Sequence, residues 1–270
     1  MWHSKNYITY IILCILIAGC SEPEVIIPPL EVPTSGKHVL VEDLTGVRCP
    51  NCPSANARLE AIKSIYGENL IIVGVHGDLL TRPLPESKFD FRNPSSRALE
   101  QSLGPILGKP SAVINRKIHP EFSNMANPLQ DQWQTIVERE LQLPQQIVLQ
   151  MDVIPIDSDY MLNIGILPMA DLGSGYRLHV MVTENNIIDA QEDVDRIIDD
   201  YEHNHILRAI VSPFEGILLD RPLQKDDLIN TSLNIEGDMI EPFTTIDNME
   251  IIVFITDDEG SVEEVMTVSF

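Results

Sequence analysis

The spacing of hydrophobic positions changes near the middle of the chain, and the change predicts two kinds of architecture. Between residues 37 and 143, apolar runs of strand length alternate with segments whose apolar residues recur every three to four positions. From residue 144 to residue 270, short β-rich runs are separated by turn sequences rich in Asp, Ser and Gly. The pattern therefore predicts an α/β domain over 37–143, followed by an all-β domain over 144–270.

The first of these segments alternates strands and helices. Its apolar run over 70–76 is continuous, as is typical of a strand buried in a parallel sheet. The Gly-Lys-Pro sequence before residue 111 is typical of a turn with a cis-proline. In order, we expect a strand over 38–44, a helix ending at Gly67, a strand over 70–76, an irregular loop over 77–94, a helix over 95–103, a strand after Pro110 and a helix over 128–143.

The second segment contains seven short runs of strand type with turn signals between them. Apolar and polar residues alternate clearly in two of these runs, 146–154 and 176–184, so one face of each is expected to be buried. Such a series predicts an immunoglobulin-like antiparallel β-sandwich. The runs are 146–154, 160–167, 176–184, 206–212, 227–235, 249–256 and 262–270.

The N-terminal residues read as an export signal rather than as part of a fold. Residues 1–20 hold a weakly basic start, an apolar core and the ending Leu-Ile-Ala-Gly-Cys, which resembles a bacterial lipobox. Cleavage before Cys20 would place a lipid on its sulfur, and residues 21–36, rich in Pro and Glu, would form an extended tether. The alternative is an uncleaved anchor helix over the same residues.

Cysteine usage then points to redox chemistry. Cys14 would leave with the signal and Cys20 would be lipidated, so Cys49 and Cys52 would be the only thiols of the mature protein. An exported protein faces an oxidising compartment, in which disulfides persist. A ring closed between such near neighbours removes little entropy from the unfolded chain, so stability is a weak reason for the pair.

The two thiols fall where a strand turns into a helix. Unpaired N–H groups and partial positive charge at a helix start favour a thiolate, the form that attacks disulfides. Cys49 is therefore expected to have a lowered pKa, with Cys52 one turn further on. Pro50 is expected at the first helical position, where its missing N–H is not needed.

Charge and motifs exclude several other functions. The net charge is −23, so the surface should repel nucleic acid. The acidic clusters at 192–195 and 199–200 lack the spacing of a calcium loop and predict a solvated face. The sequence also lacks a Gly-rich phosphate loop, a Gly-x-Ser-x-Gly elbow and a His-Glu-x-x-His motif, and we expect no cofactor.

Histidines offer two weaker candidates for a metal site. In an extended segment, His203 and His205 would lie on one face, but they lack a third ligand at a recognisable spacing, which favours a structural role. The cysteine pair with His76 would supply three ligands of a zinc site that needs four. We therefore expect no metal. His76 ends a strand, so it either borders the active cleft or is structural.

In the order of its elements, the segment over 37–142 resembles thioredoxin. The resemblance implies that Cys49 attacks a target disulfide and that Cys52 resolves the mixed disulfide. It also implies a cis-proline at Pro110 that contacts substrate, and a buried carboxylate at Asp43, six residues before Cys49, that relays the proton of the resolving thiol. Thioredoxins usually carry Trp where this chain has Arg48, a cation that should favour the thiolate further.

Almost the whole chain resembles the twenty-eight-kilodalton outer-membrane lipoproteins of Bacteroidetes-type bacteria. The matching residues are Leu40–Gly46, Cys49-x-x-Cys52-Pro53 and His203–Arg208. The resemblance implies a thioredoxin-like domain, a C-terminal β-sandwich and an outer-membrane location, with the membrane face left open. Expected neighbours of the cleft are Arg48, Pro50, His76 and Lys109.

Two functions remain open from the sequence. The first is a lipid-anchored thiol-disulfide oxidoreductase that acts on thiols or disulfides of exported proteins. The second is a non-enzymatic binding or structural lipoprotein in which Cys49 and Cys52 form a settled disulfide.

Overall fold

The computed structural model describes residues 36–240 and 242–270. The predicted signal peptide, the lipidation site Cys20 and nearly all of the predicted tether lie outside these residues. The elements are β1 (Val39–Leu44), α2 (Cys52–Tyr66), β2 (Leu70–Val75), α3 (Pro94–Ser102), β3 (Ser111–Ile114), β4 (Ala126–Asn127), α4 (Gln130–Leu141), β5 (Ile147–Ile156), β6 (Asp159–Pro168), β7 (Arg177–Glu184), β8 (Ile187–Glu192), β9 (Ile197–His203), β10 (Ile206–Ile210), β11 (Ile217–Leu218), β12 (Ile229–Ile235), β13 (Met249–Thr256) and β14 (Val262–Ser269), with 3₁₀ turns at Gly67–Asn69, Gly237–Ile240 and Ile246–Asn248.

The first half forms a mixed sheet covered by helices on both faces. β1 pairs in parallel with β2 and antiparallel with β3, and β3 pairs with the short β4, which gives the order β2-β1-β3-β4. One face packs against the apolar sides of α2 and α4, with Leu59 and Trp133 among the buried residues. The other face packs against α3 through Leu99. The predicted alternation of strands and helices is confirmed.

Strands from the second half extend this same sheet. β10 pairs in parallel with β2 at Ile206 and Gly74, and β7, β13 and β14 continue from β10, so that with β11 the sheet has nine strands. The join is close: the Gly74 N–H donates to the His205 carbonyl at 2.7 Å, and a Cβ at Gly74 would lie 3.3 Å from that oxygen. A side chain at Gly74 would therefore push the His205 carbonyl back by a few tenths of an ångström.

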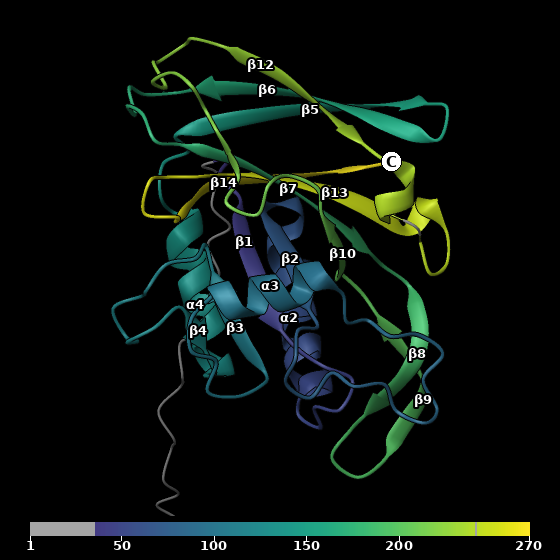
Figure 1. The fold of residues 1–270 in the computed structure, drawn as a ribbon. Helices are drawn as coiled ribbons and strands as arrows, with labels where there is room; N and C mark the ends of the chain where they lie inside the picture. The colour runs from purple at the N-terminus through teal and green to yellow at the C-terminus, as the bar shows by residue number, and fades with distance from the viewer. Residues whose placement is uncertain (1–35, 241) are drawn as a thin grey trace, which may run out of the picture. The chain divides into compact units, whose positions relative to one another are not determined.

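A second layer covers part of the main sheet. All seven runs predicted as strands are present, and three of them form the separate antiparallel sheet β12-β6-β5. Its inner face packs on β7, β13 and β14 through one apolar core that includes Leu162, Ile164, Val180 and Val253 (Figure 1). The three-stranded sheet is therefore one layer of a sandwich, and the other layer is formed by β7, β13 and β14 of the main sheet. β4, β8, β9 and β11 were not predicted.

A buried ion pair in the first half, between Arg116 and Glu42 of β1, lies against β13 of the second half. Glu42 in β1 is fully buried, and the guanidinium of Arg116 donates to its carboxylate at 2.6 Å and 3.1 Å. The same guanidinium lies 4.8 Å from the ring centre of Phe254 in β13. The Glu42 carboxylate offsets the cost of burying the Arg116 cation, and the stacking on Phe254 brings this pair into contact with the second half.

None of the helices in the described part of the chain is both long enough and apolar enough to cross a bilayer.

Candidate redox site

Cys49 and Cys52 form a disulfide at the start of α2. The S–S distance is 2.11 Å, and the Cα atoms lie 5.3 Å apart. The helix begins at Cys52, so the prediction that Pro50 occupies its first position is wrong: the Cys52 N–H donates to the Cys49 carbonyl in a turn that precedes the helix. Pro53 instead occupies the first helical turn, where it disturbs no hydrogen bond.

Neither cysteine has exposed surface. One enclosing segment is the β8–β9 hairpin, residues 187–203, which we call the arm and which extends away from the main sheet in Figure 1. From the arm, Gln191 Nε2 donates to the carbonyls of Cys49 and Gly46 at 3.2 Å and 3.3 Å, and the Glu192 N–H donates to the Val47 carbonyl at 2.8 Å. The arm is therefore fastened to the turn that carries the disulfide.

A second enclosing segment is the irregular stretch over 77–93, which we call the covering loop. The Arg48 N–H donates to the Leu80 carbonyl at 2.9 Å, and the Arg48 side chain donates to the carbonyls of Arg82 and Pro83 at 2.9 Å and 2.7 Å. A Cβ at Gly46 would overlap the Leu80 carbonyl oxygen, so only glycine permits this approach. Arg48, predicted to favour the Cys49 thiolate, binds the covering loop.

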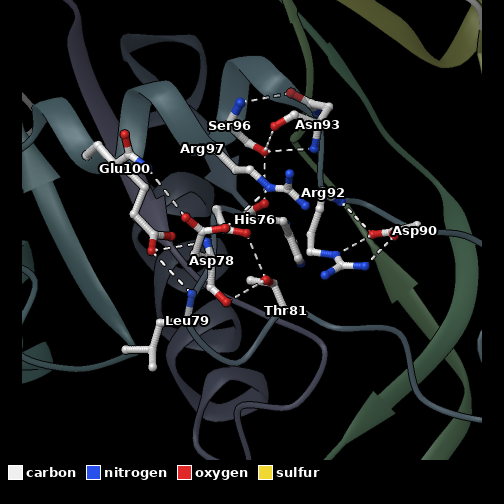
Figure 2. A network of polar contacts seen from close by, with 12 residues as sticks. His76, Asp78, Leu79, Thr81, Asp90, Arg92, Asn93, Ser96, Arg97 and Glu100 are labelled. Atoms are coloured by element: carbon white, nitrogen blue, oxygen red, sulfur yellow. Dashed lines mark hydrogen bonds and ion pairs between the residues drawn. The ribbon is translucent and has the colours of Figure 1, made fainter.

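The covering loop is in turn held by α3, as Figure 2 shows. Ser96 Oγ donates to the His76 carbonyl at 2.8 Å, and Ser96 also forms a reciprocal cap with Asn93 at the start of the helix. Glu100 accepts from the N–H groups of Asp78 and Leu79 at 3.2 Å and 3.3 Å. These bonds fix the end of β2 and the path of the loop past the cysteines.

Asp43, at the end of β1, is the ionisable group of the site. It is 4% exposed, and its Oδ1 has no hydrogen-bond partner among the described residues. The surrounding hydrogen-bond partners assign the Asn56 amide the orientation in which its nitrogen donates to Asp43 Oδ2 at 3.0 Å and to the Cys52 carbonyl at 3.1 Å, while its oxygen accepts from the Tyr201 hydroxyl at 3.3 Å. Burial raises the pKa of Asp43 to about 7, although the Lys109 cation opposes this rise.

Pro110 follows a cis peptide bond, as the sequence predicts, and lines a hollow beside the cysteines. This proline hollow, of about 510 Å³, is bounded by Asn51 and Ser54 at the start of α2, by residues 107–110, by Pro128, and by Gln130, the first residue of α4. Its rim includes Leu107, which is 85% exposed. Lys109 turns away from solvent to pair with Glu100 at 2.5 Å, and burial lowers its pKa.

His76 and His203 line a different, polar pocket of about 240 Å³, which Asp43, Asn56 and Tyr201 also line. Burial lowers the pKa of His76 well below its ordinary value and that of His203 to about 4, so both rings are neutral at pH 7. His205 has φ +59° in the turn after β9, so it does not share a face with His203, and its Nε2 contacts Glu60 at 3.1 Å.

The described residues contain no group of three or more His, Cys, Asp or Glu able to hold a metal ion. Sequence reasoning missed Asn56, Tyr201 and Gln191. Asn56 had a local signal, because it lies one helical turn after Cys52 on the side that faces β1. Tyr201 and Gln191 had none, since only the folded arm brings them to the cysteines.

A family model described as "Outer membrane protein Omp28" matches residues 98–270. Among solved structures, HBP35 of Porphyromonas gingivalis has a TM-score of 0.68 and 16% identity, over 90% of this chain and 77% of that one. At that identity the likeness shows the fold alone. A β-glucosidase 3B from Thermotoga neapolitana has a TM-score of 0.25 and 13% identity, over 46% of this chain and 16% of the enzyme, which is too low a similarity to indicate a shared fold. No curated protein matches the chain.

Proposed function

The chain belongs to the Omp28 family of outer membrane proteins, and on that premise we propose that it is a lipid-anchored envelope protein that exchanges disulfides with exported proteins through Cys49 and Cys52. In this proposal, the lipid is attached at Cys20. Residues 37–143 form a thioredoxin-like domain; the sheet order β2-β1-β3-β4, with helices on both faces and a cis-proline before β3, supports that assignment.

The observation that carries the proposal is the environment of Asp43. A buried carboxyl without a cationic partner in contact costs folding free energy, and its Oδ1 is unpartnered among the described residues. Asn56 connects this carboxyl to the backbone of Cys52. A group that titrates near neutral pH beside a cysteine pair has the property required of a general acid and base in thiol exchange.

The chemistry divides into two reversible steps. In the reduced protein, the Cys49 thiolate attacks one sulfur of a target disulfide; a mixed disulfide forms and the other target sulfur leaves as a thiolate. Asp43 then accepts the proton of Cys52, whose thiolate attacks the Cys49 sulfur. This second attack forms the Cys49–Cys52 disulfide and releases the second target thiolate. The target gains two electrons, the protein loses two, and the reverse sequence oxidises a target dithiol.

The proline hollow is where we place the target chain. It lies directly against the start of α2, and Leu107, Pro110 and Pro128 give it apolar walls. Such walls suit an extended apolar segment, which an exported protein exposes before folding is complete. Exchange also requires the arm to move, since both cysteines lack exposed surface. Such a movement must break the two Gln191 bonds to the turn and the bond from the Glu192 N–H to the Val47 carbonyl.

Trapping of mixed disulfides tests this proposal. In a Cys52→Ser variant, Cys49 can attack a target but the adduct cannot be resolved, so cell envelopes should yield adducts that a reductant releases. Cys49→Ser is the matched control, because it also leaves one thiol at the same turn. We expect at least several-fold more adduct from Cys52→Ser. Equal or absent trapping in the two variants would remove the basis for an exchange activity.

One observation favours the second candidate function, a binding or structural lipoprotein with a settled disulfide: neither sulfur is accessible while the arm and the covering loop are in place. The reduction potential of the Cys49–Cys52 pair separates the two functions. A potential below about −300 mV, with a disulfide that resists reduction in the folded protein, supports the structural function. A higher potential supports exchange.

A further inference from the structure

The polar pocket gives Asp43 an opening that the cysteines do not share. Its walls come from the ends of β1 and β2, from the exposed side of α2 at Asn56, Ala57 and Glu60, and from residues 201–206 of the arm and the following turn. Neither Cys49 nor Cys52 is among its lining residues. The carboxyl therefore contacts Cys52 through Asn56 and also lines a pocket to which neither cysteine contributes.

Three polar atoms from residues that line this pocket have no hydrogen-bond partner among the described residues: Asp43 Oδ1, His76 Nδ1 and His203 Nε2. The three residues are 4%, 2% and 3% exposed. Buried polar atoms of this kind are normally satisfied by ordered water, which occupies about 30 Å³ per molecule. A pocket of about 240 Å³ has room for several such molecules, and the three unpartnered atoms offer them hydrogen-bond partners.

We propose that this pocket is the route by which protons pass between Asp43 and solvent, with His76, His203 and Tyr201 as the positioning residues that hold its water. The inference rests on the exchange function proposed above and extends it. Asp43 would gain or lose its proton while the arm stays closed over the cysteines. Proton transfer and target access would then use separate openings.

The groups around Asp43 agree with this assignment. Lys109, from the loop before β3, is the cation that acts on Asp43, and it is itself paired with Glu100. On the pocket side, burial raises the pKa of Tyr201, so its hydroxyl stays protonated, and both histidines are neutral at pH 7. At the exposed edge, Glu60 pairs with His205. Solvation through the pocket should therefore influence the titration of Asp43 directly.

Filling the mouth of the pocket tests the route. Ala57 is exposed and lines the pocket, whereas Ala61 is exposed on the same helix and does not line it. Leucine suits a helix nearly as well as alanine, so both Ala57→Leu and the control Ala61→Leu should fold. The Asp43 carboxyl would be titrated by ¹³C NMR in the oxidised protein and assigned with Asp43→Asn. We expect Ala57→Leu to raise the Asp43 pKa by about one unit, because it excludes water from the carboxylate, and Ala61→Leu to leave it unchanged.

The possible results separate this inference from the proposed function. Identical titration of Asp43 in the wild type and in both variants would overturn the solvent route, whatever the trapping experiment shows. A shift in Ala57→Leu alone supports the route. If that shift appears while Cys52→Ser traps no target, the exchange function fails, and the pocket remains the solvent contact of a buried carboxyl.

Discussion

The buried carboxyl of Asp43 makes folding stability depend on pH in an unusual direction. The change we consider is Asp43→Asn, which keeps the shape of the side chain and removes its ionisation. Burial raises the pKa of Asp43 from its ordinary value of 3.8 to about 7 in the folded protein. At about 1.4 kcal/mol for each pKa unit, this difference corresponds to about 4 kcal/mol of unfolding free energy.

The sign follows from which state holds the proton. Between pH 4 and pH 7 the unfolded chain has lost the Asp43 proton while the folded protein keeps it, so the folded state binds more protons. The stabilising contribution is complete below about pH 4 and is lost as pH rises to about 7. The Asp43→Asn side chain does not ionise, so this variant does not lose that stabilising contribution as pH rises. Its stability relative to wild type should therefore rise by about 4 kcal/mol from pH 4 to pH 8.

Urea unfolding of the oxidised protein, followed by circular dichroism at intervals between pH 4 and pH 8.5, gives the two stability curves. Their difference cancels the other titrating groups, which the two proteins share. Asp195→Asn is the matched control, since it makes the same charge change at an exposed position. Its difference from wild type should stay nearly flat.

A flat difference for Asp43→Asn would refute the reasoning, because Asp43 would then ionise alike in the folded and unfolded states. A difference that falls with pH would mean that Asp43 is a stabilised carboxylate. That result would also remove the acid and base function that we propose for it.

Three further predictions concern the contacts that build and cover the site. In urea unfolding, Arg116→Met should lower the unfolding free energy by about 3–5 kcal/mol, because it leaves the Glu42 carboxylate buried and unpaired. The control Arg139→Met breaks an ion pair whose side chains are 38% and 41% exposed, so it should cost far less. Equal losses in the two variants would contradict the importance of burial. Gly46→Ala should destabilise the protein by about 1–3 kcal/mol, since the added Cβ would overlap the Leu80 carbonyl. A Cβ added at Gly108 has no neighbouring atom within 4 Å, so the control Gly108→Ala should be neutral in the same assay. Gln191→Ala should speed reduction of the disulfide by a phosphine about tenfold, because it removes the hydrogen bonds that fasten the arm to the cysteine turn. Gln224→Ala, at an exposed position, is the control. An unchanged rate in Gln191→Ala would show that the arm does not limit access to the disulfide.

The sequence by itself determined the features that depend on neighbouring residues. Periodicity over one or two turns located α2, α3 and α4, and short β-rich runs between turn signals located the seven strands that were predicted in the second half. The spacing of Cys49 and Cys52 predicted a pair able to close a ring, and a Gly-x-Pro before a strand predicted the cis peptide at Pro110. These features need no partner from elsewhere in the chain.

Tertiary structure decided everything that depends on distant pairing. β10 pairs with β2 at Gly74, whose N–H donates to the His205 carbonyl, so the second half of the chain extends the first sheet. The arm, read from sequence only as a solvated acidic face, brings Gln191 and Tyr201 to the cysteine turn more than 140 residues away in sequence. The pKa of Asp43 likewise follows from burial by several elements at once. Burial and long-range contacts arise only when distant segments pack together, so the polarity of neighbouring residues cannot predict which side chains meet.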